Sequence, residues 1–176
     1  MTAPEERSEA VVVRTATVDD VPLILSMIRE LAEFERSLHE VLATEENLRE
    51  SLFAGQPAVF CHIAEVVGQP VGYALWFPNF STWLGKHGLY LEDLYVRPEA
   101  RGCGVGTALL RELAGICLDR DYGRLEWWVL DWNEKAIAFY RSIDAVPMDE
   151  WTVQRLTGDA LRALAARDVT RDRPLD

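Results

Sequence analysis

The pattern of hydrophobic positions in the first third of the chain changes from a β-branched run, typical of a strand, to helical spacing. Residues 11–15 are almost all β-branched and are typical of a strand. Thr17 then supplies a helix start, and apolar residues recur at helical spacing over 24–32. A second helix is expected from Thr44, whose hydroxyl can cap it. This region therefore predicts one strand followed by two helices.

The remaining two thirds alternate between strand and helix patterns. Residues 58–66 and 71–77 are rich in β-branched and aromatic side chains around a turn with Gly and Pro, which predicts a β-hairpin. The elements expected after it are a strand at 88–96, a helix that ends near Arg120, a strand at 124–130, a helix at 134–142, a closing strand at 151–156 and a helix at 158–166.

This order predicts one α/β domain in which a mixed β-sheet is flanked by helices. The hairpin makes the sheet antiparallel at first, and the strand at 124–130 is expected to run parallel to its neighbour because a helix intervenes. The domain is expected to span 11–166, with 1–10 and 167–176 as flexible tails.

Composition narrows the possible functions. The chain has 176 residues, 49% of them hydrophobic, which suits one globular domain with a sizeable core. Its formal net charge of −11 argues against a nucleic-acid surface, because phosphate contacts need a basic patch. A cationic partner fits this charge better, although acidity also serves solubility.

The cysteines indicate neither a disulfide framework nor a metal site. Cys61, Cys103 and Cys117 are odd in number, widely spaced and lack a C-x-x-C pair. The N-terminus is polar, and no apolar run reaches the roughly 18 residues that a membrane span needs. We therefore expect a cytoplasmic protein with no membrane span and no bound metal.

A glycine-rich loop at 101–106 carries the clearest chemical signal. Its three glycines lack the Cβ atoms that would hold an anion away from the backbone, and an amphipathic helix follows directly. The free amides and the positive end of the helix dipole favour a phosphate group there, and the arginine adds a cation. The predicted phosphate-binding residues are Arg101, Gly102, Cys103, Gly104, Val105, Gly106 and Thr107.

The loop by itself leaves the nucleotide open. A dinucleotide enzyme would need a buried strand running straight into the first glycine and an acid further on, which Glu126 or Asp131 could supply. However, a turn at 97–101 intervenes, and Glu92 and Asp93 lie inside the preceding strand. A kinase-type phosphate loop fails because no Gly-Lys-Ser/Thr ends the run. Competition between NAD and coenzyme A would distinguish these hypotheses.

The loop taken with its neighbours resembles the GNAT superfamily of N-acetyltransferases. Residues 91–106 match the family's strand, turn and coenzyme A loop of the form Arg/Gln-x-x-Gly-x-Gly/Ala, and Asn133 with Phe139 and Tyr140 matches the second half of its signature. The segments 28–35, 83–93 and 131–141 are similar to the diamine (spermidine/spermine) acetyltransferase branch. Together the resemblance covers about residues 13–164.

This resemblance implies an acetyl-CoA-dependent enzyme that acetylates a primary amine of a small cationic substrate by direct attack in a ternary complex. It also implies a homodimer in which Glu35 could serve a neighbour's site. The main-chain groups of Leu94, Tyr95 and Val96 would hold the acetyl and pantetheine groups. Further coenzyme contacts are expected from Asn133, Lys135, Ala136 and Arg141.

The chemistry assigns two catalytic candidates and a set of substrate contacts. Glu92 is the candidate to orient the amine and pass its proton to water, and Tyr140 is the candidate acid for the departing thiolate. Carboxylates and an aromatic wall suit a diamine, and the substrate-binding candidates are Glu35, Glu92, Asp93, Trp128 and Glu150. Among the tryptophans, the resemblance alone implies Trp128.

Two observations modify this hypothesis. Polyamine-acting members of the family can carry an acid just before the loop tryptophan, but here Ser81 and Thr82 precede Trp83, which argues against a long polyamine. Asp144 stands where glycine is common, so we expect a left-handed turn there. The alternative hypothesis is a catalytically silent module that binds coenzyme A and regulates a partner.

Overall fold

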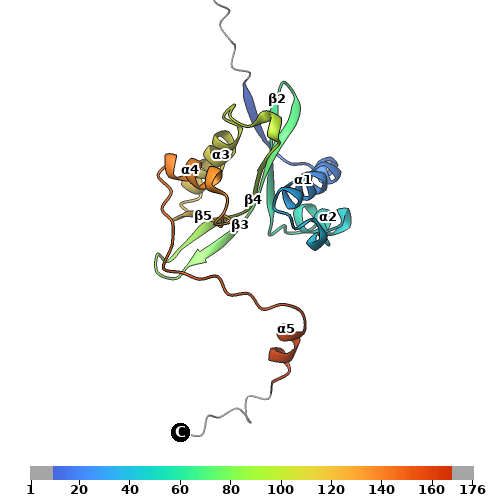
Figure 1. Ribbon diagram of the computed structural model, residues 1–176, viewed down its shortest axis with the longest axis vertical. Coiled ribbons are helices and arrows are strands. Elements are labelled where there is room, and N and C mark those ends of the chain that lie inside the picture. The colour runs from blue at the N-terminus through green and yellow to red at the C-terminus, as the bar shows by residue number, and fades with distance from the viewer. Residues whose placement is uncertain (1–9, 168–176) are drawn as a thin grey trace, which may run out of the picture. The chain divides into compact units, whose positions relative to one another are not determined.

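The computed structural model describes residues 10–167 (Figure 1). These residues belong to two compact units, of which the first ends at Trp128 and the second begins at Val129. Apart from Ala10 and Arg167, the predicted tails at 1–10 and 167–176 lie outside the described residues. The extent predicted for the domain, 11–166, stays a prediction.

The first unit contains a sheet whose strands follow in the order of the chain. Its strands are β1 (Val11–Thr15), β2 (Phe60–Val66), β3 (Gln69–Ser81), β4 (Lys86–Val96) and β5 (Leu125–Trp127). β1 to β4 pair antiparallel, and β5 pairs parallel to β4. The predicted mixed sheet is therefore confirmed.

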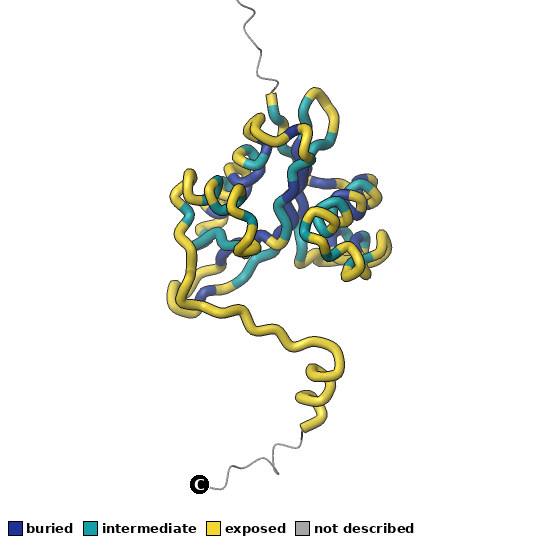
Figure 2. The backbone as a smooth tube through the Cα atoms, in the orientation of Figure 1, coloured by how far each residue is buried: buried dark blue, intermediate teal, exposed yellow. Residues whose placement is uncertain are grey.

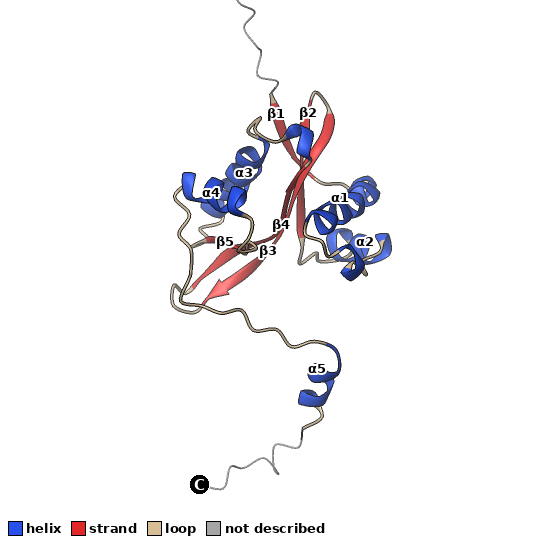
Figure 3. Ribbon diagram, in the orientation of Figure 1, coloured by secondary structure: helices blue, strands red, loops and turns tan. Residues whose placement is uncertain are grey.

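Helices cover both faces of this sheet. α1 (Val21–Phe34) and α2 (Glu45–Phe53) pack on one face, and α3 (Val105–Asp119) packs on the other (Figure 3). Short 3₁₀ helices occur at Val18–Asp20, Leu38–Glu40 and Pro98–Ala100. The second unit holds α4 (Glu134–Ser142) and α5 (Gly158–Ala165).

The 3₁₀ helix Val18–Asp20 that leads into α1 is stabilised by the carboxylate of Asp20, which also contacts the sheet. It accepts hydrogen bonds from the Thr17 amide and hydroxyl at 2.7 and 3.0 Å. Arg14 on β1 donates to both Asp20 oxygens at 2.7 and 2.8 Å and to Glu65 on β2 at 2.7 Å. The Arg14 hydrogen bond lowers the pKa of Asp20 to about 2. These contacts tie the predicted helix start to two strands.

The buried residues lie mainly in the sheet and in the helix surfaces that pack against its two faces (Figure 2). On the α1 face, Ile24 and Met27 of α1 pack with Ile63 and Tyr73 of the sheet, and each of these four residues is fully buried. On the α3 face, Trp76 is 1% exposed, and its indole N–H donates to the buried His62 Nδ1 at 3.1 Å. Of the apolar residues expected at helical spacing over 24–32, Ile24 and Leu25 are buried, whereas Ile28, Leu31 and Ala32 are half-buried.

Three strand predictions need correction. Residues 151–156 form no strand, because no strand within 10–167 pairs with them and isolated extended chain is not a stable sheet. β5 covers three residues instead of 124–130. β3 instead continues beyond 77 through Pro78, since it has only β4 as a neighbour after Trp76 and its free edge tolerates a missing N–H.

Candidate active site

A β-bulge interrupts β4 at its two acids. Leu75 on β3 pairs with Asp93, and Trp76 pairs with Leu91, so Glu92 has no partner across the strand pair. One extra residue reverses the alternation of side chains in the rest of the strand. Leu91 therefore shares the α3 face with Trp76, whereas Asp93 shares the α1 face with Leu75. Without the bulge the second acid would point to the opposite side of the sheet.

Three of the predicted substrate-binding acids meet at this bulge. Glu92 is exposed, Asp93 is partly buried, and Glu35 follows directly after α1. Burial, together with repulsion from Glu92 and Glu35, raises the pKa of Asp93 to about 6. Burial also raises the pKa of Glu35. These carboxylates lie close enough to influence one another, which is a suitable environment for a cation.

Tyr73 is a polar residue of this site that the sequence patterns did not indicate. It is fully buried on β3, and its hydroxyl donates to Asp93 Oδ2 at 2.9 Å. Burial and the neighbouring Asp93 charge raise the pKa of its phenol well above the ordinary value. A tyrosine inside an apolar strand resembles a core residue, so only the pairing of β3 with β4 identifies its partner.

Trp128 supplies an aromatic wall on the same face of the sheet as Asp93. Its exposed ring lies edge-on to Tyr90 with the centroids 5.6 Å apart. Successive side chains of a strand point to opposite faces. Because Leu91 is on the α3 face, Tyr90 is on the α1 face. Trp128 therefore lies on the α1 face with Asp93, and its contact with the methylenes of an amine stays a prediction.

The β5 side of β4 is bare beyond the bulge. β5 pairs with β4 only as far as Leu91, and no other strand within the described residues covers this edge. The Arg97 amide donates to Val71 O on β3 at 2.9 Å, and alternation then directs the main-chain groups of Leu94 and Val96 away from β3. The Leu94 N–H and C=O and the Val96 N–H can hydrogen-bond an extended ligand that carries amides, as an added strand would, whereas Val96 O already accepts from Arg101.

The glycine loop leads into α3 with the geometry expected for anion binding. Gly102 and Gly104 adopt left-handed φ values of 80° and 82°, and a Cβ on either would point into open space. Gly104 is the N-cap, so no side chain caps the first-turn amides of α3. These amides and the helix dipole can receive a phosphate.

Two arginines fix the turn between β4 and this loop. Arg97 donates to both Glu30 oxygens of α1 at 2.9 and 3.0 Å, which lowers the pKa of Glu30. Arg101 donates to Val96 O at 2.8 Å, and its guanidinium lies over the ring of Phe34 at 5.1 Å. The expected contact between Arg101 and a phosphate stays a prediction.

The second unit carries the other half of the predicted signature on α4. Asn133 caps this helix, and its side-chain oxygen accepts from the Ala136 amide at 3.3 Å. Tyr140 is partly buried in the last turn, next to Phe139 with ring centroids 5.5 Å apart. Two cationic candidates, Lys135 and Arg141, are exposed on the same helix. The expected left-handed turn after it is confirmed, because Asp144 has a φ of 60°.

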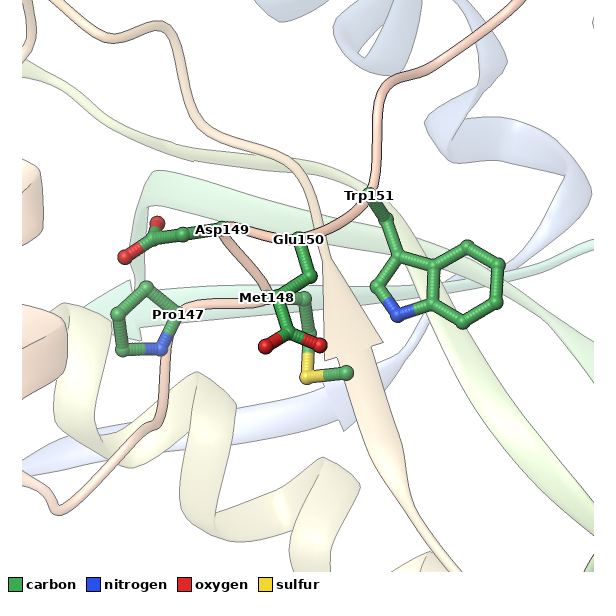
Figure 4. Close-up of a pocket in the computed structure, with 5 residues that line it drawn as sticks. All are labelled: Pro147, Met148, Asp149, Glu150 and Trp151. Atoms are coloured by element: carbon green, nitrogen blue, oxygen red, sulfur yellow. The ribbon is translucent and has the colours of Figure 1, made fainter.

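Glu150 lies in a turn of consecutive residues in the second unit. Pro147, Met148, Asp149, Glu150 and Trp151 line a shallow pocket, and the Trp151 amide donates to Met148 O at 3.1 Å (Figure 4). Glu150 and Trp151 are both exposed. The substrate contact of Glu150 stays a prediction.

Metal and membrane features are absent from the part of the chain that the structure describes. Within 10–167, no three His, Cys, Asp or Glu side chains are grouped closely enough to hold a metal ion. None of the helices in that range is both long and apolar enough to cross a bilayer.

Comparison with known proteins defines the class. A family model described as the acetyltransferase (GNAT) family matches residues 25–144. Mouse thialysine N-epsilon-acetyltransferase is 39% identical over 166 residues, which cover 88% of this chain and 97% of that protein. L-ornithine N5-acetyltransferase from Arabidopsis thaliana is 33% identical over 197 residues, covering 86% of each. The chain therefore belongs to the GNAT acetyltransferase family.

A solved structure shows the same fold. The integron cassette protein from the mobile metagenome of V. cholerae superposes with a TM-score of 0.74 at 26% identity, covering 89% of this chain and 98% of that one. The predicted fold class and the predicted class of enzyme, an N-acetyltransferase, are confirmed.

Proposed function

We propose that this chain transfers the acetyl group of acetyl-CoA to a primary amine of a small cationic substrate by direct attack in a ternary complex. The observation that carries the proposal is the β4 bulge, which places Glu92 and Asp93 directly before a bare strand edge and the glycine loop. Thialysine and ornithine, named for two relatives, define the size of substrate that we expect.

The residues present fit coenzyme A as the co-substrate. The first-turn amides of α3 and the left-handed Gly102 and Gly104 suit a diphosphate, and the edge at Leu94–Val96 suits the amides of a pantetheine arm. The co-substrate supplies the activated acetyl group as a thioester. Asn133, Lys135, Ala136 and Arg141 are further proposed contacts.

The acidic groups at the bulge address the main difficulty of the reaction, which is obtaining a neutral amine. An amine with a pKa near 10.4 is neutral in about one molecule in 2,500 at pH 7, which costs roughly 4 to 5 kcal/mol. Glu35 and Asp93 would attract the cationic substrate. Glu92, the exposed residue of the bulge, would orient the reacting nitrogen and pass its proton to water.

Tyr140 is the proposed general acid. The nitrogen attacks the thioester carbonyl carbon, the C–S bond breaks, and the sulfur leaves with the electron pair as a thiolate. A phenol, whose ordinary pKa is about 10, can protonate a sulfur whose conjugate acid has a pKa of about 8.5 once that sulfur carries charge. Tyr140 then recovers a proton from solvent.

The tip of the β3–β4 hairpin argues for a short substrate. Ser81 is buried and its hydroxyl accepts from the Leu84 amide at 3.2 Å, so it offers no charge to a distant ammonium. Thr82 is exposed and neutral, and Trp83 beside it is 88% exposed. Residues 81–83 supply no carboxylate for the far end of a polyamine, and the nearby Asp121 is ion-paired with Lys86 at 2.6 Å, so ornithine- or thialysine-sized amines are favoured.

The test is a steady-state assay of acetyl-CoA with ornithine, thialysine, lysine, diamines and spermidine. We expect turnover of the short amines and a lower kcat/KM for spermidine. Tyr140→Phe should lower kcat by about 100-fold or more while the coenzyme A Kd changes less than about twofold. Tyr122→Phe, which removes a phenol from the α3 end, is the matched control. Coenzyme A binding without turnover of any amine would support the silent module instead.

We also propose a homodimer in a reducing, cytoplasmic compartment. The family resemblance supports the dimer, and the free thiols of Cys61, Cys103 and Cys117 support the compartment. Analytical ultracentrifugation would decide the first, because a single monomeric species at micromolar concentration contradicts it. Fractionation of the source cells would decide the second.

A further inference from the structure

We propose that Tyr73 is a positioning residue of the amine site, which holds the Asp93 carboxylate where it can receive a substrate ammonium. The inference rests on the proposed function. It assigns a role to a fully buried side chain that lies one strand away from the bulge.

The sheet register brings the two residues together. Tyr73 lies opposite Tyr95, and Leu75 lies opposite Asp93, so Tyr73 and Asp93 are diagonal neighbours on the α1 face. The phenolic oxygen is 2.9 Å from Asp93 Oδ2. This contact exists only because the bulge turns Asp93 to the face of Tyr73. Without the extra residue the carboxylate and the phenol would lie on opposite sides of the sheet.

The buried location of Tyr73 indicates that its hydroxyl has a specific role. The ring of Tyr73 fills core space that a phenylalanine would fill equally well, and a buried hydroxyl loses stability unless it is hydrogen-bonded. The hydroxyl here directs its hydrogen to a carboxylate at the rim of the site. A donor held by the core restricts the orientation of Asp93 more than a surface side chain would.

The groups around Asp93 leave Tyr73 as the stabilising partner of its charge. Tyr73 faces it from β3, Glu35 from the end of α1 and Glu92 from β4, while the Cys61 thiol on β2 lies close enough to respond to its charge. Burial and the two glutamates raise the pKa of Asp93, and the Tyr73 hydrogen bond lowers it, with a result of about 6. Loss of the phenol should therefore leave more Asp93 protonated near neutral pH.

The test is the pH dependence of kcat/KM for Tyr73→Phe relative to the unmodified enzyme, with a short amine. If the variant raises the pKa of Asp93 by about one unit, kcat/KM falls about fivefold at pH 6 and stays nearly unchanged at pH 8. The loss should appear in KM, because Asp93 binds the substrate and does not transfer a proton. Tyr122→Phe, on the α3 side, is the control and should give a ratio independent of pH.

A second readout does not need turnover. Titration of the side-chain carboxyl of Asp93 by ¹³C NMR, assigned with Asp93→Asn, should show a higher pKa in Tyr73→Phe than in the unmodified enzyme. An unchanged Asp93 pKa overturns the role of Tyr73. Failure of the unmodified enzyme to acetylate any amine overturns the proposed function separately.

The double variant Tyr73→Phe/Asp93→Asn tests whether Tyr73 acts through Asp93. It should lose no more kcat/KM than Asp93→Asn does, and a further loss would contradict the inference. If Tyr73→Phe fails to fold, Asp93→Asn with Tyr73 intact remains as a test. It should abolish the acid limb of the pH profile between about pH 5 and 7, and a retained limb contradicts the inference.

Discussion

Replacing Gly104 by alanine tests the assignment of the glycine loop to an anion. Gly104 has a φ of 82° at the N-cap of α3, and a residue with a Cβ is disfavoured there by about 1–2 kcal/mol. If the loop keeps its shape, this strain lowers the free energy of unfolding. If the loop relaxes, the same energy is needed to restore the binding geometry, and the coenzyme A Kd rises about 5- to 30-fold. The added methyl group would also point into the space where a phosphate is expected.

Gly115→Ala is the matched control on the same helix. Gly115 lies inside α3 with an ordinary φ, and a Cβ there meets nothing within 4 Å. The substitution should raise the free energy of unfolding by about 0.5–1 kcal/mol and leave coenzyme A affinity unchanged. Urea unfolding and calorimetric titration measure both quantities. If Gly104→Ala matched Gly115→Ala in stability and in affinity, the left-handed loop would have no role in binding.

Three further predictions concern stability. Arg14 lowers the pKa of Asp20 to about 2 from its ordinary 3.8, so this pair contributes about 2 kcal/mol to the free energy of unfolding above pH 4. That contribution is lost as the pH falls toward 2. The difference in stability between Asp20→Asn and the unmodified protein should therefore shrink over that range in urea titrations. Gly72→Ala places a Cβ 2.6 Å from the Tyr95 carbonyl oxygen across the β3–β4 pair and should cost about 2 kcal/mol or more by the same method, and wild-type stability would refute the close approach. Asp144→Gly relieves a left-handed φ and should raise the melting temperature, whereas a lower value would show that the aspartate contributes a compensating contact.

The helices and the antiparallel strands were predictable because their signals are local. The Thr44 cap is present, since its hydroxyl accepts from the Asn47 amide at 3.2 Å, and α4 covers the predicted residues 134–142. The prediction of a closing strand at 151–156 was wrong because a strand does not depend on local signals alone. Alternating apolar residues favour extended chain, but a strand also requires a partner edge, which depends on distant parts of the chain.

Local motifs likewise indicated the glycine loop proposed to bind coenzyme A, but they could not resolve the geometry of the proposed amine site. Gly102 and Gly104 lie directly before the helix, and glycine is the residue type that adopts their left-handed conformation without strain. Asp93 and Glu92 were recognisable as acids inside an apolar strand. The face of the sheet to which each acid points depends on one residue of β4 that has no partner on β3. No local sequence pattern predicts where this unpaired residue lies.

The amino-acid sequence by itself therefore determined the α/β class, the order of the elements up to α4, the position of the glycine loop before α3 and membership in a family of acetyltransferases. Only the tertiary structure decided that Tyr73 and Asp93 meet, that Glu35 adds its charge to the same site, and that β4 is left bare beyond Leu91. The reason is physical: helix caps and turns are set by neighbours within a few residues, whereas the pKa of Asp93 and the exposed edge arise from contacts between segments far apart in the chain.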